Sequence, residues 1–122
     1  MNRIPDIIGL KIISIIYRGD SIFTIIIQDK YGELIDLNLL EVEYLEMAEV
    51  LNGEITIISE QGIGIKHIGI LDKRNLDRNE FKSIYLQIKK DNNLFSLHGL
   101  MKKTEIGEHS QKYNPISDDK YS

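Results

Sequence analysis

Residues 10–28, LKIISIIYRGDSIFTIIIQ, decide the fold. Two isoleucine-rich runs flank Arg18-Gly19-Asp20, a turn sequence, and therefore predict two antiparallel strands at residues 10–17 and 21–28. The apolar residues fall on both faces of each strand, which is typical of strands covered on both sides. A chain of 122 residues has little material for two covering layers. We therefore expect the sheet to curl into a sandwich or half-barrel, or a second subunit to cover one side as a homodimer.

Three further strands follow from shorter patterns. Residues 33–39 alternate, with Ile35, Leu37 and Leu39 expected inside. Residues 54–59 form a short apolar run that ends in a turn. Residues 63–71, IGIKHIGIL, predict another strand, in which the glycines mark bulges.

Residues 77–90 fit two structures. Ile84, Leu86 and Ile88 alternate as in a strand, whereas Asp77 and Glu80 stand where a helix would be capped. The turn sequence DNN that follows, ahead of LFSLHGL at residues 94–100, favours a hairpin. The helix remains the alternative.

From residue 39 the apolar spacing changes to that of a helix. Asn38 stands at the N-cap position, Glu41 at the capping-box position, and Gly53 at the C-terminal stop. The apolar side chains gather on one side, and the other side carries Glu43, Glu46 and Glu49. We expect an acidic amphipathic helix of about twelve residues here, although the alternation at residues 41–44 would also suit a strand. The predicted fold is α+β: a mainly antiparallel sheet of six or seven strands with this one helix.

The domain organisation follows from where the apolar spacing ends. Residues 1–103 predict a single domain, and residues 104–122 predict a polar, loosely ordered tail. The apolar run near the N-terminus is interrupted by Lys11 and lacks a cleavage site, so we interpret it as a strand rather than a signal peptide. We expect no membrane association, because every apolar run is far shorter than the roughly 18 residues of a membrane helix.

Composition and charge narrow the function classes. The chain contains no cysteine, which removes disulfides and thiolate zinc sites and suits a cytoplasmic protein. The net charge is −4, and residues 29–54 hold eight acids against one base. Such a surface repels nucleic acid phosphates and favours a basic protein partner.

The candidate partner-binding residues are the carboxylates on and beside the expected helix. Its glutamates repel one another at a spacing of three residues, and one lies near the C-terminal end, where the helix dipole disfavours an anion. A face that tolerates this repulsion is suited to meeting positive charge. The predicted contact residues are Asp36, Glu41, Glu43, Glu46 and Glu49.

Other chemistry has weaker support in the sequence. The spacing of Asp36, Glu41 and Glu43 matches no calcium loop, and we expect neither a metal nor a cofactor. His67 and His98 fall within expected strands and are interpreted as structural. A general acid–base role for either would need a convergent partner. We therefore do not expect an enzyme.

Two adjoining stretches carry a resemblance to a known class. IIGLKIISIIYRGDSIFTIIIQDKYGELIDL at residues 7–37, followed by the acidic LLEVEYLEMAEVL at residues 39–51, resembles the small acidic immunity proteins of bacterial toxin systems, including contact-dependent growth inhibition. The resemblance implies a cytoplasmic protein that binds one cognate toxin, often a nuclease, and blocks its active site. It also implies that the five carboxylates named above pair with toxin lysines and arginines.

Two alternatives remain open. One is a phage-encoded inhibitor of a host defence protein, which would also be small and acidic. The other is a small ligand-binding domain or enzyme that uses His67 and His98.

Overall fold

The computed structural model describes residues 4–109, apart from the side chains of Pro5 and Lys66. The elements are two 3₁₀ helices, eight strands and one α-helix. In chain order they are η1 (Ile4–Ile7), β1 (Lys11–Gly19), β2 (Ile22–Gln28), β3 (Leu34–Leu40), β4 (Tyr44–Met47), β5 (Glu54–Gln61), α1 (Ile65–Lys73), η2 (Arg78–Glu80), β6 (Lys82–Lys90), β7 (Asn93–Met101) and β8 (Lys103–Glu108).

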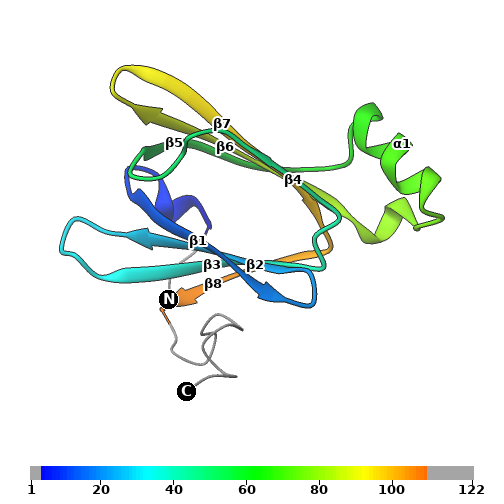
Figure 1. Cartoon of the computed structure of the whole chain (residues 1–122), viewed down its shortest axis with the longest axis horizontal. Coiled ribbons are helices and arrows are strands. Elements are labelled where there is room, and N and C mark those ends of the chain that lie inside the picture. Colours follow the sequence, from blue (N-terminus) through cyan, green and yellow to red (C-terminus); the bar gives the residue numbers. More distant parts are fainter. Residues whose placement is uncertain (1–3, 110–122) are drawn as a thin grey trace.

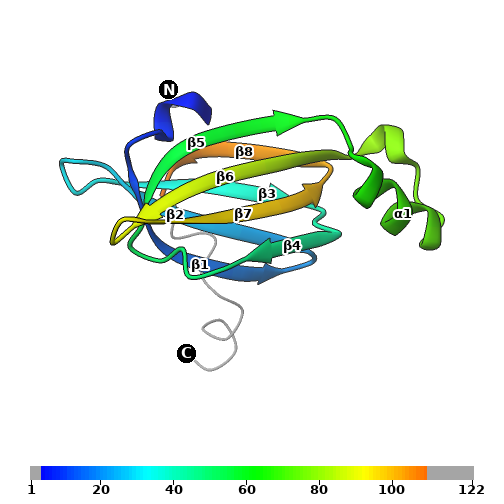
Figure 2. The ribbon, with the colours of Figure 1, turned by 90° about the horizontal axis from the view of Figure 1, so that it is seen from above.

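The strands form two stacked layers of one antiparallel sheet, with the order β4-β7-β6-β5-β1-β2-β3-β8. Figure 1 shows β4, β7, β6 and β5 above β1, β2, β3 and β8, with α1 at one end of the upper layer. In the middle of this order, β1 pairs with β5 and so joins the two layers. Within the described residues this pairing contains one residue pair, Lys11 with Glu54. In the view from above, the strands of the two layers cross at an angle (Figure 2).

The chain also passes directly from one layer into the other at two places, between β3 and β4 and between β7 and β8. The chain passes from β3 to β4 through Glu41, whose φ of 52° lies in the left-handed region and turns the chain sharply. The chain passes from β7 to β8 at Lys102. The amide of Glu43 donates to the carbonyl of Leu100 at 2.9 Å and the amide of Lys102 to that of Leu40 at 3.1 Å, so that the strand pairing continues around this corner.

The main core lies between the layers and draws on both. Alternate residues of β2, β3 and β6 point inward, as expected of a sandwich. Its buried members are Ile7, Ile12, Ile25, Ile27, Ile35, Leu37, Leu39, Val50, Ile55, Ile84, Leu86, Ile88, Leu97 and Met101. The doubly apolar first hairpin is therefore covered on its inner face by the other layer of the same chain.

Several predictions are confirmed. The chain is α+β and mainly antiparallel, with eight strands rather than six or seven. The first hairpin forms, and Asp20 and Ser21 both adopt positive φ in its two-residue turn. Residues 82–90 form a strand paired with β7, which decides the open choice at residues 77–90 in favour of the hairpin.

The prediction of an acidic helix from residue 39 onward is wrong. Residues 39–51 contain the end of β3, the turn at Glu41, strand β4 and a loop. Tyr44 to Met47 pair with Leu97 to Leu100 of β7, at least fifty residues later in the chain. This distant partner supplies the backbone hydrogen bonds that local spacing would assign to a helix.

The strand expected at residues 63–71 is also wrong, because the helix of this chain lies there, at Ile65–Lys73. His67 and Leu71, four residues apart, are both buried, whereas Ile65 is 90% exposed. Two buried side chains four residues apart lie on the same face of a helix.

The domain boundary moves as well. β8 spans Lys103–Glu108 and pairs with β3, so the domain extends beyond residue 103. The rest of the expected tail, residues 110–122, lies outside the described residues.

Candidate functional site

The two layers leave an opening between β1 and the chain from β4 to β5. Backbone hydrogen bonds close it at both ends. At one end the amide of Val42 donates to the carbonyl of Ser21 at 2.9 Å, and at the other the amide of Ile12 donates to the carbonyl of Gly53 at 3.0 Å. Between these closures, β1 and β4 have no strand pairing with each other among the described residues. Each strand thus turns one edge toward the opening.

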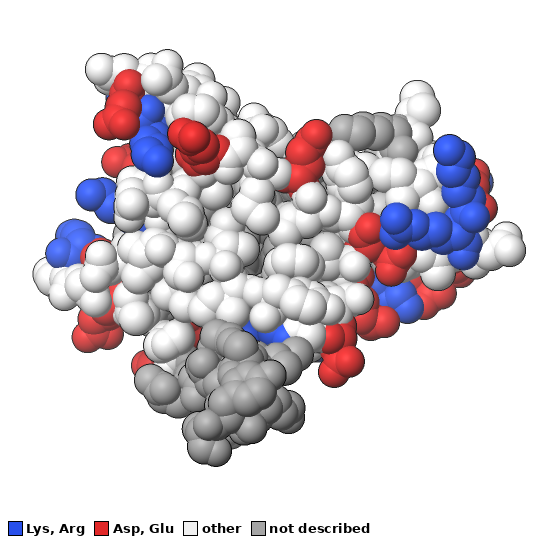
Figure 3. Space-filling view, viewed as in Figure 1, with Lys and Arg blue, Asp and Glu red and all other residues white. Residues whose placement is uncertain are grey.

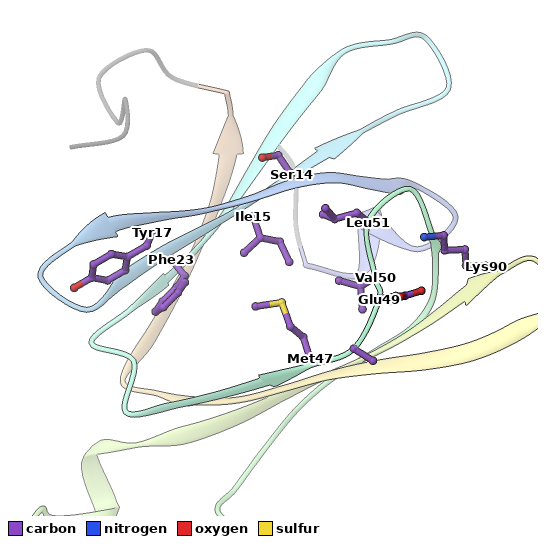
Figure 4. A pocket seen from close by; sticks show the side chains of 10 residues that line it. Ser14, Ile15, Tyr17, Phe23, Met47, Glu49, Val50, Leu51 and Lys90 are labelled. Carbon is purple, nitrogen blue, oxygen red and sulfur yellow. The ribbon is translucent and has the colours of Figure 1, made fainter. Parts of the chain in front are cut away.

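A cleft of about 560 Å³ lies behind this opening. Its size falls within the usual range for binding pockets, roughly 300–1,000 Å³. Figure 4 shows Ile15, Phe23 and Met47 pointing into it, with Tyr17 at one end. The full lining is Ser14, Ile15, Tyr17, Phe23, Met47, Ala48, Glu49, Val50, Leu51 and Lys90.

The rim of the cleft is apolar and exposed. Tyr17 is 53% exposed, Leu51 45% and Met47 41%. We call these three residues the rim. Together with the cleft they make a concave apolar surface, and apolar patches of this kind on a small protein mark interaction sites.

One acid and one base stand at the far end of the cleft, Glu49 and Lys90 (Figure 4). Neither takes part in an ion pair with another described residue. Their charges offset each other, so the cleft has no net charge.

The five predicted contact residues do not share one face. Asp36 is 1% exposed, in the middle of β3, and its Oδ1 lies 2.8 Å from Nδ1 of His109. Glu46 and Glu49 are exposed, one on β4 and the other at the end of the cleft. Whether the exposed pair contacts a partner remains a prediction.

Glu41 and Glu43 hold the corner of the sheet in place. Arg74, at the end of α1, donates from Nη1 to both the carbonyl oxygen and Oε1 of Glu43, each at 2.8 Å. Lys102 lies 3.1 Å from Glu80 Oε1 and 3.4 Å from Glu41 Oε1. The hydrogen bond to Glu80, with the negative charge of both acids, raises the pKa of Lys102 above its ordinary value. These carboxylates already have cationic partners within the chain.

The two histidines lie together. The ring centroids of His67 and His98 are 4.6 Å apart, and the ring of Tyr44 lies tilted against His67 with the centroids 5.6 Å apart. His67 belongs to α1 and is only 2% exposed, with its ring turned toward His98 of β7. Neither histidine lines the cleft between β1 and β4. Their contact therefore supports α1 on the sheet.

In residues 4–109, no three histidines or acids converge as a metal site would require. No helix in the same range is long and apolar enough to cross a membrane.

Comparison with known protein families, with curated proteins and with solved structures finds no match to this chain. The candidate site therefore rests on its own geometry. Sequence reasoning did not find the cleft, because its walls come from four strands and a loop. The one signal was the excess of apolar residues in the first hairpin.

Proposed function

We propose that this protein is an inhibitor that binds a partner protein through the cleft between β1 and β4, as an immunity protein binds its toxin. The observation that carries the proposal is the apolar cleft with its exposed apolar rim. A small molecule held between Ile15, Phe23 and Met47 would cover Met47 but would leave much of the exposed surface of Tyr17 and Leu51 in water. A partner surface that covers cleft and rim together would remove all of this area from water, which is the main gain in protein association.

The inhibitory role is supported by the resemblance of residues 7–51 to small acidic immunity proteins. By that resemblance the partner is a toxin, and a nuclease fits it best. The contact surface that we propose is not the one expected from the sequence, since Glu41 and Glu43 have partners within the chain and Asp36 is buried.

Differential capture tests the proposal. Tagged wild-type protein and the double variant Met47→Asp/Leu51→Asp are exposed to the same cell lysate, with Leu94→Asp as the matched control. Leu94 is a 62% exposed leucine on the β6–β7 hairpin, outside the cleft. We expect wild type and Leu94→Asp to retain one stoichiometric protein that the double variant loses, at unchanged melting temperatures. The purified partner should then lose its activity when wild-type protein is added at equal concentration.

Retention of the same partner by the double variant would place the contact elsewhere on the molecule. A partner whose activity is unchanged by binding would reject the inhibitory role.

A further inference from the structure

We infer that the segment of the partner that enters the cleft is short, extended and uncharged, and that it inserts one large apolar side chain between Ile15, Phe23 and Met47. This inference rests on the proposed function and specifies its partner. It follows from three properties of the opening: its two closures, its strand edges and its balance of charge.

The closures limit the length of the segment. The opening runs along β1 from Ile12, which is bonded to Gly53, to the turn that follows the strand, where Ser21 is bonded to Val42. The lining residues that β1 contributes lie within positions 14–17. At about 3.3 Å per residue, four residues of strand span roughly 13 Å. A segment lying in this opening therefore has about four residues in contact, and its ends must leave toward solvent.

The strand edges favour an extended conformation. A strand edge presents a row of amide and carbonyl groups that bind a further strand. An added segment that pairs with the edge of β1 would direct alternate side chains inward. Ile15, Phe23 and Met47 point into the cleft from β1, β2 and β4, so an inward side chain of the segment would contact all three strands (Figure 4).

The charge balance disfavours a basic segment. Glu49 and Lys90 stand at the same end of the cleft, and a cation attracted by the first is repelled by the second. Figure 3 shows the face on which β1 and β4 lie, with most charged side chains toward its margins and uncharged side chains in its middle. An apolar side chain needs no charge partner in such a place, whereas a buried cation would.

Selection from a random seven-residue peptide library displayed on phage tests the inference. Wild-type protein is the bait, and Met47→Asp/Leu51→Asp is used to remove peptides that bind elsewhere. We expect the surviving peptides to share an uncharged stretch of about four residues with a phenylalanine, leucine, isoleucine or tryptophan at its centre. A synthetic copy should bind wild type and the charge-free variant Glu49→Gln/Lys90→Gln equally, within about threefold, at both low and high salt.

Other outcomes overturn the inference. Enriched lysines or arginines, with affinity that falls more than about tenfold as salt rises and is lost in Glu46→Lys/Glu49→Lys, would make the site electrostatic. Absence of any cleft-dependent peptide would reject a short segment, as would self-association of the wild type through the rim, seen as a dimer by size-exclusion chromatography that Met47→Asp/Leu51→Asp abolishes. The lysate capture decides the proposed function separately, because it scores a whole partner protein rather than a peptide.

Discussion

The carboxylates of residues 36–49 have separate roles, which their equal charge in the sequence conceals. Asp36 is buried against His109, and Glu43 accepts two hydrogen bonds from Arg74. Glu49 stands at the cleft without an ion-pair partner among the described residues. A surface ion pair is worth at most about 1 kcal/mol, so the link between Arg74 and Glu43 orients α1 more than it stabilises the fold. Acidity alone therefore does not identify a contact surface in this chain.

Gly53 gives a prediction at the scale of one residue. The sequence suggests a helix stop there, but in the structure Gly53 is where the loop passes closely over β6. A Cβ at this position would overlap the Cγ2 atom of Ile88 and lie 3.2 Å from the carbonyl oxygen of Val50. We expect Gly53→Ala to lower the free energy of unfolding by about 1–3 kcal/mol, as overpacking of a core does.

The matched control for that variant is Gly62→Ala, because a Cβ there would meet nothing within 4 Å. Chemical denaturation should find the control within about 0.5 kcal/mol of wild type. Equal stability of the two variants would mean that residues 50–53 do not lie against β6.

At the scale of elements, the helix and one strand exchange places relative to the sequence prediction. Leu40, Tyr44 and Leu51 fit a helical face by spacing, yet Tyr44 and Leu45 enter a strand, because β7 offers backbone partners to this stretch. Residues 65–73 are rich in β-branched residues, yet they form α1. In both segments, tertiary contacts outweigh the local preference for helix or strand. These contacts join residues far apart in the chain, so a short stretch of sequence does not reveal them.

Burial within α1 tests that element directly. Leu71 is fully buried in a second apolar cluster with Phe81 and Leu100, while Ile65 is 90% exposed on the same helix. We expect Leu71→Ala to cost about 2–5 kcal/mol, since it removes a buried side chain and leaves a cavity. Ile65→Ala should change stability by less than about 0.5 kcal/mol.

Thermal unfolding followed by circular dichroism distinguishes these variants. A strand at residues 63–71 would put positions 65 and 71 on the same face, since they are an even number apart, and both variants would then have similar effects. A large loss in Ile65→Ala would therefore argue against the helix.

The first hairpin and the β6–β7 hairpin could be predicted because each is formed by residues that are close together in the sequence. In both, a turn sequence separates two apolar runs, and the inward positions Ile84, Leu86 and Ile88 follow simple alternation. The cleft could not be predicted in the same way. Its wall joins Ile15 to Met47 across the opening, and only the bend of two strands at the corner places them there.

At the scale of the whole molecule, the two layers depend on each other. Inward residues of β2 and β6 belong to one core, although among the described residues the layers share only one strand pair in the middle of the sheet order. The bends at Glu41 and Lys102 carry two strands from one layer into the other. Neither layer can keep its apolar face buried alone, so both should unfold together.

Paired core variants test this cooperation. Ile25 in the lower layer and Leu86 in the upper layer are both 0% exposed within the core. We expect Ile25→Ala and Leu86→Ala each to lower the free energy of unfolding by about 2–5 kcal/mol. Each variant should keep one sharp transition, with the denaturant dependence of the wild type, since a single cooperative unit loses both layers at once. Two transitions, one of them unaffected by Ile25→Ala, would mean that the upper layer folds independently, and the cleft between the layers could then open without unfolding the sheet that carries β4.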